Sequence, residues 1–272
     1  MLVQSVWPNR LAARHGDVWR AAFLSPAARL APLFDREASE LIGIICAMPD
    51  EVSGFAPLGG GSQQAEFARV RLDGIDAVIA LAGLGKVRAA RAATVLVERW
   101  QCRALVSAGT AGGLDGAEPM QVVIGTELIQ HDYGRSRGHG DLELFRPGDI
   151  PLPENSGKPF TIDLPAAQRR AYESAAGGID YARFGRYASG DQFVNDAATR
   201  AKLVALGAIA VDMECAAVAQ VAECYGLPWL VAKGISDDAS ASSHDAFMLG
   251  LAEAARRSAE VVGVLLPALL AR

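Results

Sequence analysis

The chain has 272 residues, of which 51% are hydrophobic and 21% are charged, and its formal net charge is -5 at pH 7. This composition is typical of a packed globular protein and argues against a mainly disordered chain. The negative charge argues against a protein that binds nucleic acid along its phosphates, because such proteins usually carry a basic surface. Small anionic ligands are still compatible with it.

The four cysteines form no CxxC pair and no pairing with histidine, so we expect reduced thiols rather than a zinc site. Residues 1–40 lack the unbroken apolar core of a signal peptide. The best candidate for a membrane span, residues 261–270, has about half of the roughly 20 residues that a membrane helix needs. The sequence therefore predicts a cytoplasmic protein with no membrane partner.

Residues 1–40 are interpreted as an N-terminal extension with one or two helices, and residues 41–272 as one domain. The domain opens with the apolar run 41–47, which is typical of a strand buried on both faces. Residues 48–52 follow with a proline at a first helical position and acids in the first turn, which favours a helix.

Strands and helices then alternate along the chain, which indicates one α/β domain with a mixed or parallel central sheet flanked by helices. Between the expected elements, residues 134–159 are rich in Gly, Pro and charge and are interpreted as a long loop. The remaining expected elements are strand pieces in 69–81 around a turn at 73–74, a helix at 87–100, a strand from 104 that runs into a glycine-rich loop at 109–113, a strand at 121–131, a helix at 165–176, strands at 183–189 and 209–212, a helix at 214–225, a strand at 228–235 and a helix from 245 to about 270.

Carboxylates and hydroxyls follow several of these strands. In open α/β sheets, ligands collect at the carboxyl ends of the strands, so these side chains are expected to meet. Each of them alone is explained as well by helix capping. Together they favour a site for acid/base chemistry on a small polar molecule. They are Glu51, Thr110 beside Gly109, the run Asp212, Met213 and Glu214, and the pair Ser236 and Asp237.

Other motifs carry less information. The segment at 83–86 lacks the third glycine of a dinucleotide fingerprint and the Lys-Ser/Thr pair of a P-loop, so a tight strand-to-helix turn explains it better. Glycines 109–113 either bring backbone N–H groups to a ligand or form a sharp turn. His131, His139 and His244 have no partner at metal-ligand spacing, and Ser107 lacks the context of a nucleophile elbow.

Several segments match, in order, the purine nucleoside phosphorylase/uridine phosphorylase superfamily. The chain most closely resembles its hydrolytic branch, the 5′-methylthioadenosine/S-adenosylhomocysteine nucleosidases. The resemblance implies one α/β domain with a mixed central sheet, a homodimer, and hydrolysis without cofactor or metal. The matching segments are GIICAMPDEV at 43–52, GLGKV at 83–87, SAGTAGGL at 107–114, SGDQFV at 189–194, VDME at 211–214 and ISD at 235–237.

The resemblance also implies catalytic roles. Asp237, supported by Ser236, would be the acid that protonates N7 of the purine. Glu51 would orient and deprotonate the attacking water, with Thr110 near that water. Purine leaves poorly as an anion, so a positioned proton donor lowers the barrier, typically by about 10²–10⁴-fold in rate.

Substrate-binding roles follow in the same way. Glu214 would bind the ribose hydroxyls and Met213 would line the sugar. Phe193 would stack on the base while the backbone of Val194 reads its edge. Met48 would pack near the ribose and its 5′ side, and Gly109 would lie at the substrate.

The choice between hydrolase and phosphorylase depends on phosphate binding. The phosphorolytic branch has arginines near the first strand-end loop and before the Gly-Thr/Ser loop, because a buried phosphate needs charge-assisted donors. This chain has residues 48–51 and Ser107 there instead. An acid repels phosphate, so water is the expected nucleophile.

The sequence departs from the family pattern at three places. Asp212 replaces a glutamate, and Lys233 with Gly234 replaces an Arg-Ala pair. The excursion at 132–159, with its arginines, is either a solvated loop or a receiver of a polar 5′ group, as in a futalosine-type nucleoside. A phosphate-dependent phosphorylase and a non-catalytic nucleoside-binding protein are further alternatives.

Overall fold

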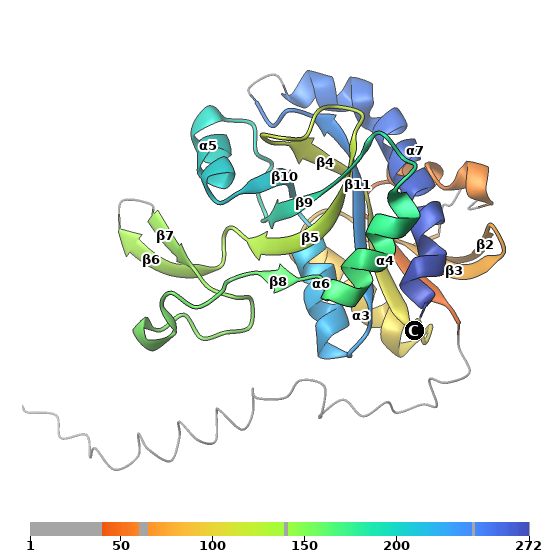
Figure 1. Cartoon of the computed structure of the whole chain (residues 1–272), viewed down its shortest axis with the longest axis horizontal. Helices are drawn as coiled ribbons and strands as arrows, with labels where there is room; N and C mark the ends of the chain where they lie inside the picture. Colours follow the sequence, from red (N-terminus) through yellow and green to blue (C-terminus); the bar gives the residue numbers. More distant parts are fainter. Residues whose placement is uncertain (1–39, 60–64, 139–140, 241–242, 272) are drawn as a thin grey trace, which may run out of the picture.

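The computed structural model describes residues 40–59, 65–138, 141–240 and 243–271 (Figure 1). The helices expected in residues 1–40 therefore lie almost wholly outside the described residues. Within the described part, the chain alternates between strands and helices, as the apolar runs indicate. The expected α/β architecture with a mixed central sheet and flanking helices is confirmed.

A nine-stranded sheet forms the centre of the described structure, in the order β10-β9-β5-β11-β4-β1-β3-β2, with β8 paired to β5. Five of its described strand pairs are parallel, whereas β2 on β3, β11 on β5, β8 on β5 and β10 on β4 are antiparallel. Its strands are β1 (Ile42–Cys46), β2 (Phe67–Leu72), β3 (Ile75–Leu81), β4 (Ala104–Gly113), β5 (Val122–Gln130), β8 (Ile162–Asp163), β9 (Ala182–Ser189), β10 (Ala208–Asp212) and β11 (Trp229–Asp237).

One half of this sheet closes on itself, because β10 pairs with β4 as well as with β9. The closing contact pairs Ala210 and Val211 with Gly113 and Gly112. A Cβ added at Gly113 would lie 2.8 Å from the carbonyl oxygen of Ala117. The glycines of the segment 109–113 therefore extend β4 and let neighbouring backbone approach, and the expected loop there is wrong.

Helices cover the sheet (Figure 1). Helix α7 packs on β11 and β4, α4 packs on α7, and α3 packs on α6 and β1. All five residues of β1 are consequently buried, as its apolar run predicts. The helices are α2 (Pro49–Ser53), α3 (Lys86–Glu98), α4 (Ala166–Ala176), α5 (Ala197–Ala205), α6 (Cys215–Cys224) and α7 (Ser243–Leu270), with short 3-10 turns at Ala56–Leu58 and Pro153–Asn155.

Two further regions differ from the sequence prediction. Within the expected loop 134–159, β6 (Gly134–Gly138) and β7 (Asp141–Leu144) form a separate two-stranded antiparallel sheet. Its Arg135 and Glu143 side chains pair across the strands. Helix α5 is absent from the prediction, although Asp196 caps it by accepting hydrogen bonds from two backbone N–H groups of its first turn.

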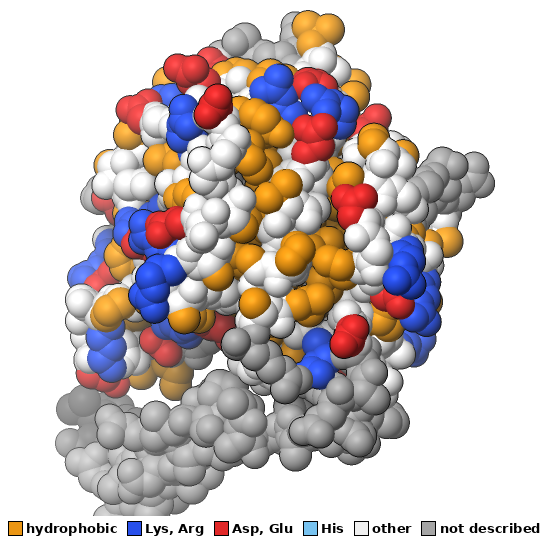
Figure 2. Space-filling model, turned by 45° about the vertical axis from the view of Figure 1, so that its right-hand side comes forward, with side chains coloured by type: hydrophobic (Ala, Val, Ile, Leu, Met, Phe, Trp, Pro, Cys, Tyr) orange, Lys and Arg blue, Asp and Glu red, His pale blue; other side chains and the backbone are white. Residues whose placement is uncertain are grey.

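The face in Figure 2 shows Lys and Arg side chains beside Asp and Glu side chains, around a central area rich in hydrophobic ones. In the described residues, no helix is both long and apolar enough to cross a membrane. Cys46, Cys102 and Cys215 are buried free thiols. Burial raises the pKa of each of them, which keeps the thiols protonated near neutral pH.

Candidate active site

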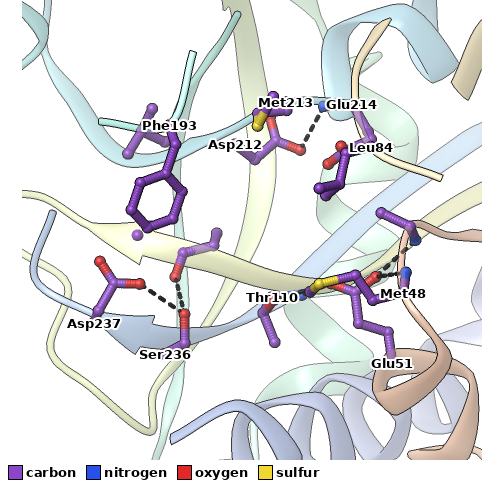
Figure 3. A pocket seen from close by; sticks show the side chains of 14 residues that line it. Met48, Glu51, Leu84, Thr110, Phe193, Asp212, Met213, Glu214, Ser236 and Asp237 are labelled. Atoms are coloured by element: carbon purple, nitrogen blue, oxygen red, sulfur yellow. Dashed lines mark hydrogen bonds between the residues drawn. The ribbon is translucent and has the colours of Figure 1, made fainter. Parts of the chain in front are cut away.

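A cavity of about 380 Å³ opens where β1, β4, β10 and β11 bring their polar residues together (Figure 3). Eight of the ten site residues predicted from the sequence line it. Among the described residues, none of those that line this cavity is a lysine or an arginine. The lining residues are Ala47, Met48, Glu51, Leu84, Thr110, Ala111, Gly112, Phe193, Val211, Asp212, Met213, Glu214, Ser236 and Asp237.

Glu51 lies in the short helix α2, which begins directly after β1 because Pro49 occupies a first helical position. Its side chain is 2% exposed. One carboxylate oxygen accepts hydrogen bonds from the N–H groups of Ala47 at 2.7 Å and Met48 at 3.1 Å. The other accepts from the N–H of Thr110 at 2.8 Å and from its hydroxyl at 2.9 Å. The carboxylate is therefore held in one orientation toward the cavity.

Burial raises the pKa of Glu51, and nearby Lys233 partly opposes this effect. The negative charge of Glu214 raises the pKa further, while the two hydrogen bonds from Thr110 lower it. The net result is a pKa above the ordinary value of a glutamate. A carboxylate with a raised pKa is a better proton acceptor, which suits a general base.

Gly109 lies against the Glu51 carboxylate and is not among the residues that line the cavity, so its expected contact with the substrate stays a prediction. Its φ is 125°, and an added Cβ would lie 2.3 Å from the carboxyl carbon of Glu51. Its N–H donates to the hydroxyl of Ser258 at 3.0 Å, and that hydroxyl donates to the carbonyl of Ala232 at 2.7 Å. The glycine makes the room that the Glu51 carboxylate occupies.

Asp212, the last residue of β10, and Glu214, the N-cap of α6, share one buried cation. The Nζ atom of Lys233 lies 2.8 Å from a Glu214 oxygen and 2.7 Å from an Asp212 oxygen, and its side chain is 1% exposed. The other Glu214 oxygen accepts from the N–H of Gly85 at 3.0 Å. Lys233 therefore fixes two carboxylates from behind the cavity.

The contacts between Lys233 and the two carboxylates keep Asp212 and Lys233 in their charged forms. Burial alone would raise the pKa of Asp212, but Lys233 and the hydrogen bonds from Cys215 and Ser189 hold it below its ordinary value. Burial would also lower the pKa of Lys233, but Asp212 and Glu214 hold it well above. Asp212 and Lys233, the two positions at which the sequence departs from the expected pattern, thus form a buried ion pair with each other.

Asp237 and Ser236 lie at the other end of the cavity, at the end of β11 (Figure 3). The Ser236 hydroxyl donates to one Asp237 oxygen at 2.8 Å, and the N–H of Ala239 donates to the other at 2.9 Å. Ala239 adopts a φ of 52°, which turns the chain back so that its N–H reaches the carboxylate. Arg200 of α5 donates to the carbonyl of Asp238 at 3.1 Å, which links α5 to this turn.

The side chains between the two ends are apolar. Phe193, which is 50% exposed, lies across the cavity from Ser236 and Asp237, and Met213 lies between it and Glu214 (Figure 3). Met48 and the exposed Leu84 lie at the Glu51 end. The sequence analysis places a substrate there through Met48 but does not predict Leu84.

Val194 is 6% exposed and packs in a small core cluster with Leu114, Ile129 and Ala188, so its side chain does not line the cavity. The prediction for this residue concerned only its backbone, and it stays a prediction. His131 also lies outside the cavity wall, with its ring packed against Gly190.

The sequence analysis misses two supporting residues. Lys233 is noted only as a departure from a family pattern, although a lysine inside the apolar run of β11 signals a buried ion pair. Ser258, in the middle of α7, has no such signal, because its contact with Gly109 joins residues far apart in the sequence.

Comparisons with known proteins assign the chain to a family. Residues 41–267 match the Phosphorylase superfamily. A 5′-methylthioadenosine/S-adenosylhomocysteine nucleosidase from Mycobacterium bovis is 34% identical over 251 residues, which cover 85% of this chain and 98% of that protein.

Two solved structures resemble the fold. The 5′-methylthioadenosine/S-adenosylhomocysteine nucleosidase from Neisseria meningitidis, in complex with methylthio-immucillin-A, has a TM-score of 0.70 and 26% identity, over 84% of this chain and 98% of that one. The futalosine hydrolase of Helicobacter pylori has a TM-score of 0.72 and 25% identity, over 84% and 97%. The chain belongs to the phosphorylase superfamily, within the family of 5′-methylthioadenosine/S-adenosylhomocysteine nucleosidases, and is a nucleoside hydrolase.

Proposed function

We propose that this protein hydrolyses the N-glycosidic bond of 5′-methylthioadenosine and S-adenosylhomocysteine and releases adenine. The observation that carries the proposal is the placement of Asp237 and Glu51 at opposite ends of one cavity, with apolar walls between them. This arrangement suits a reaction in which one carboxyl group gives a proton to the leaving base and another takes a proton from water.

In this mechanism the adenine ring lies against Phe193, with its N7 at Asp237. The Asp237 carboxyl donates a proton to N7 while Ser236 holds its second oxygen. The bond between C1′ and the base breaks with both electrons going to the base, so neutral adenine leaves. The sugar gains oxocarbenium character, which the negative charges of Glu51 and Glu214 stabilise.

Glu51 completes the reaction. It takes a proton from a water molecule as the water oxygen bonds to C1′, and Thr110 fixes the carboxylate oxygen that receives the proton. The net transfer is one proton from water to adenine, and solvent returns Asp237 and Glu51 to their starting states. Glu214, held by Lys233 and Gly85, accepts hydrogen bonds from the ribose hydroxyls.

Water rather than phosphate is the nucleophile in this proposal. A buried phosphate needs charged or N–H donors aimed at it. Beside Glu51 the cavity offers a second carboxylate, Glu214, and the buried ammonium of Lys233 is already paired with Asp212 and Glu214. A phosphate dianion next to Glu51 would be repelled.

The 5′ substituent lies at Met48 and Leu84, whose apolar side chains suit a thioether. A futalosine-type substrate is the second candidate. The likeness to futalosine hydrolase favours it, as do Arg135 and Arg137, which follow β5 in the sequence and could attract a polar 5′ group. Both arginines are paired with Glu143, which leaves less of their charge for a ligand and favours the thioether substrates.

We further propose a cytoplasmic homodimer. The first turn of α3 carries Val87, 80% exposed, close in the chain to Leu84, 56% exposed. A second copy that covers these side chains would remove apolar surface from water and narrow the cavity mouth. Sedimentation equilibrium of the wild type and of Val87→Asp tests the dimer, and an unchanged monomer mass for both would contradict it.

Release of the free base tests the function itself. We expect rapid adenine release from 5′-methylthioadenosine in phosphate-free buffer, with the same rate after phosphate is added. Hypoxanthine release from futalosine, measured in parallel, ranks the two candidate substrates. Turnover only with phosphate would replace the hydrolase by a phosphorylase, and tight adenine binding without any turnover would favour a nucleoside-binding protein.

A further inference from the structure

Three segments that follow β3, β5 and β9 meet at the N-terminus of α3. The Nζ atom of Lys86 contacts the Asp132 carboxylate and lies 3.9 Å from the Asp191 carboxylate. The N–H of Lys86 donates to Asp191 at 2.8 Å, and the N–H of Asp191 donates to Asp132 at 2.9 Å. Each of the three residues therefore contacts the other two, and we call this ring the Lys86 clasp.

The clasp leads directly to Glu214. Gly85, the residue before Lys86, donates its N–H to Glu214 at 3.0 Å. Gly85 is also the N-cap of α3 and has no side chain to cap the helix. The first N–H groups of α3 are satisfied instead by two remote carboxylates, Glu214 and Asp191. The position of the Gly85 N–H thus depends on where Asp132 and Asp191 hold Lys86.

Two side chains that line the cavity, Leu84 and Phe193, also belong to segments that the Lys86 clasp holds. Leu84 lies two residues before Lys86, and Phe193 lies two residues after Asp191. The backbone at Gly85 has a φ of 96°, and an added Cβ there would lie 3.1 Å from an Asp191 oxygen, so the two segments approach closely. The clasp therefore also fixes the separation of the two segments that carry these side chains.

The ion pair at the centre of the ring is largely covered. The side chains of Lys86 and Asp132 are 17% and 23% exposed. Burial alone would raise the pKa of Asp132, but the Lys86 ammonium and the Asp191 N–H hold it below its ordinary value. Asp132 is consequently ionised at neutral pH, and the pair is less screened than an exposed surface pair.

We propose that Lys86, Asp132 and Asp191 are positioning residues that act on the substrate through Gly85 and Glu214. None of the three lines the cavity, so their effect on the reaction is indirect. The inference rests on the proposed role of Glu214 at the ribose hydroxyls. Loss of the clasp displaces the Gly85 N–H and weakens the contact between Glu214 and those hydroxyls, while the acid and the base stay in place.

Lys86→Met tests the proposal through the substrate. Because the contact between Glu214 and the ribose hydroxyls is weakened rather than removed, we expect kcat/KM for 5′-methylthioadenosine to fall about tenfold, mainly through KM, which corresponds to about 1.4 kcal/mol. The 2′-deoxy and 3′-deoxy analogues each lack one of the hydroxyls that Glu214 binds, so we expect a smaller fall for them than for 5′-methylthioadenosine. Lys86→Arg, which keeps the charge, restores much of the loss, and Arg169→Met, which removes an exposed ion pair in α4, changes nothing.

Equal losses on all three nucleosides would overturn the positioning role and leave the proposed function intact. A wild-type enzyme that releases no base from any of them would instead overturn the proposed function. A crystal structure of Lys86→Met decides the positional claim without substrate. We expect the Gly85 N–H to move out of hydrogen-bond distance of Glu214, and an unchanged separation of 3.0 Å would overturn the inference. Asp191→Asn, which keeps an acceptor for the Lys86 N–H, serves as the second variant if Lys86→Met is unstable.

Discussion

The two ends of the cavity are built in different ways. We call the end with Glu51, the proposed general base, the base end, and the end with Asp237, the proposed acid, the acid end. At the base end, the partners of Glu51 and Glu214 include Thr110, Gly85 and Lys233, which are remote in the sequence. At the acid end, the Asp237 carboxylate accepts hydrogen bonds from Ser236 and Ala239, both within two residues of it. The base end is therefore held by distant segments in addition to the local N–H groups of Ala47 and Met48, whereas the Asp237 carboxylate is held by the local turn after β11.

The difference has a chemical reason. A base that must stay ionised while buried needs several donors, because an unpaired buried carboxylate is costly. An acid that must hold a proton and then give it away is better served by few partners. Changes at the base end should consequently cost both stability and activity, whereas changes at the acid end should cost activity alone.

The pair Asp237→Asn and Glu51→Gln tests this contrast with the largest expected effect. Each removes a proton-transfer group, so kcat should fall by about 10²–10⁴-fold in both variants. Asp237→Asn keeps an oxygen for Ala239, and its amide can donate to Ser236, which can then donate to the Ala111 carbonyl. Its free energy of unfolding should stay close to that of the wild type.

Glu51→Gln should behave differently, because its amide NH₂ must face N–H donors on one side or the other. We expect a loss of about 1–3 kcal/mol in the free energy of unfolding. Urea titrations of both variants measure the difference. Equal stabilities for the two variants would contradict the contrast, and near-full kcat in Asp237→Asn would remove its role as the acid.

Lys233→Met removes the buried cation that pairs with Asp212 and Glu214 at the base end. It leaves Asp212 and Glu214 buried without their cation, and such changes cost about 3–5 kcal/mol. The folded pKa of Asp212 is lowered, so its contribution is present above its unfolded pKa and is lost as pH falls. The stability gap between wild type and variant should accordingly be largest at neutral pH and narrow in acid.

Urea unfolding at several pH values measures this gap, with the exposed Lys158→Met as control. A gap that is independent of pH would show that the carboxylates do not depend on Lys233.

Gly109→Ala sharpens the comparison without changing any charge. Its Cβ would lie 2.3 Å from the Glu51 carboxyl carbon, so the carboxylate must move. A displacement of about 1 Å at a reacting group costs about 10²-fold in rate. Gly178→Ala, whose Cβ meets nothing within 4 Å, is the matched control in steady-state assays. If the two variants were equally active, Gly109 would not set the position of Glu51.

Thr110→Val has the smallest expected effect. The Thr110 hydroxyl lowers the pKa of Glu51, so its removal raises that pKa further. Glu51 must be ionised to accept a proton, and kcat/KM therefore falls as pH falls through its pKa. The acid limb of the pH profile should move to higher pH in Thr110→Val and stay in place in the control Thr94→Val. A shift in the opposite direction would assign the limb to another group.

The sequence predicts the strands and most helices because their apolar runs are long and their ends are marked by Gly, Pro or acids. Glu51 and Asp237 are predicted for a related reason, since each is a carboxylate at or just after the end of an apolar strand. The glycines of β4 are misread because a glycine run is typical of a loop, whereas here it allows close strand approach.

The residues that hold the site are harder to predict. Gly85, Asp191 and Ser258 act through contacts that join distant segments, and no local pattern marks them. Lys233 alone carries a signal, as a cation inside an apolar strand. Local chemistry therefore predicts the reacting groups, and tertiary packing determines their support.

The identity of the sugar product tests the central claim most directly. 5′-Methylthioadenosine is incubated with the protein in buffer that contains excess phosphate, and the products are separated by mass. With Glu51 activating water, we predict free 5-methylthioribose and adenine, with no phosphorylated sugar. 5-Methylthioribose 1-phosphate as the main product would contradict the account, because phosphate would then be the nucleophile beside Glu51.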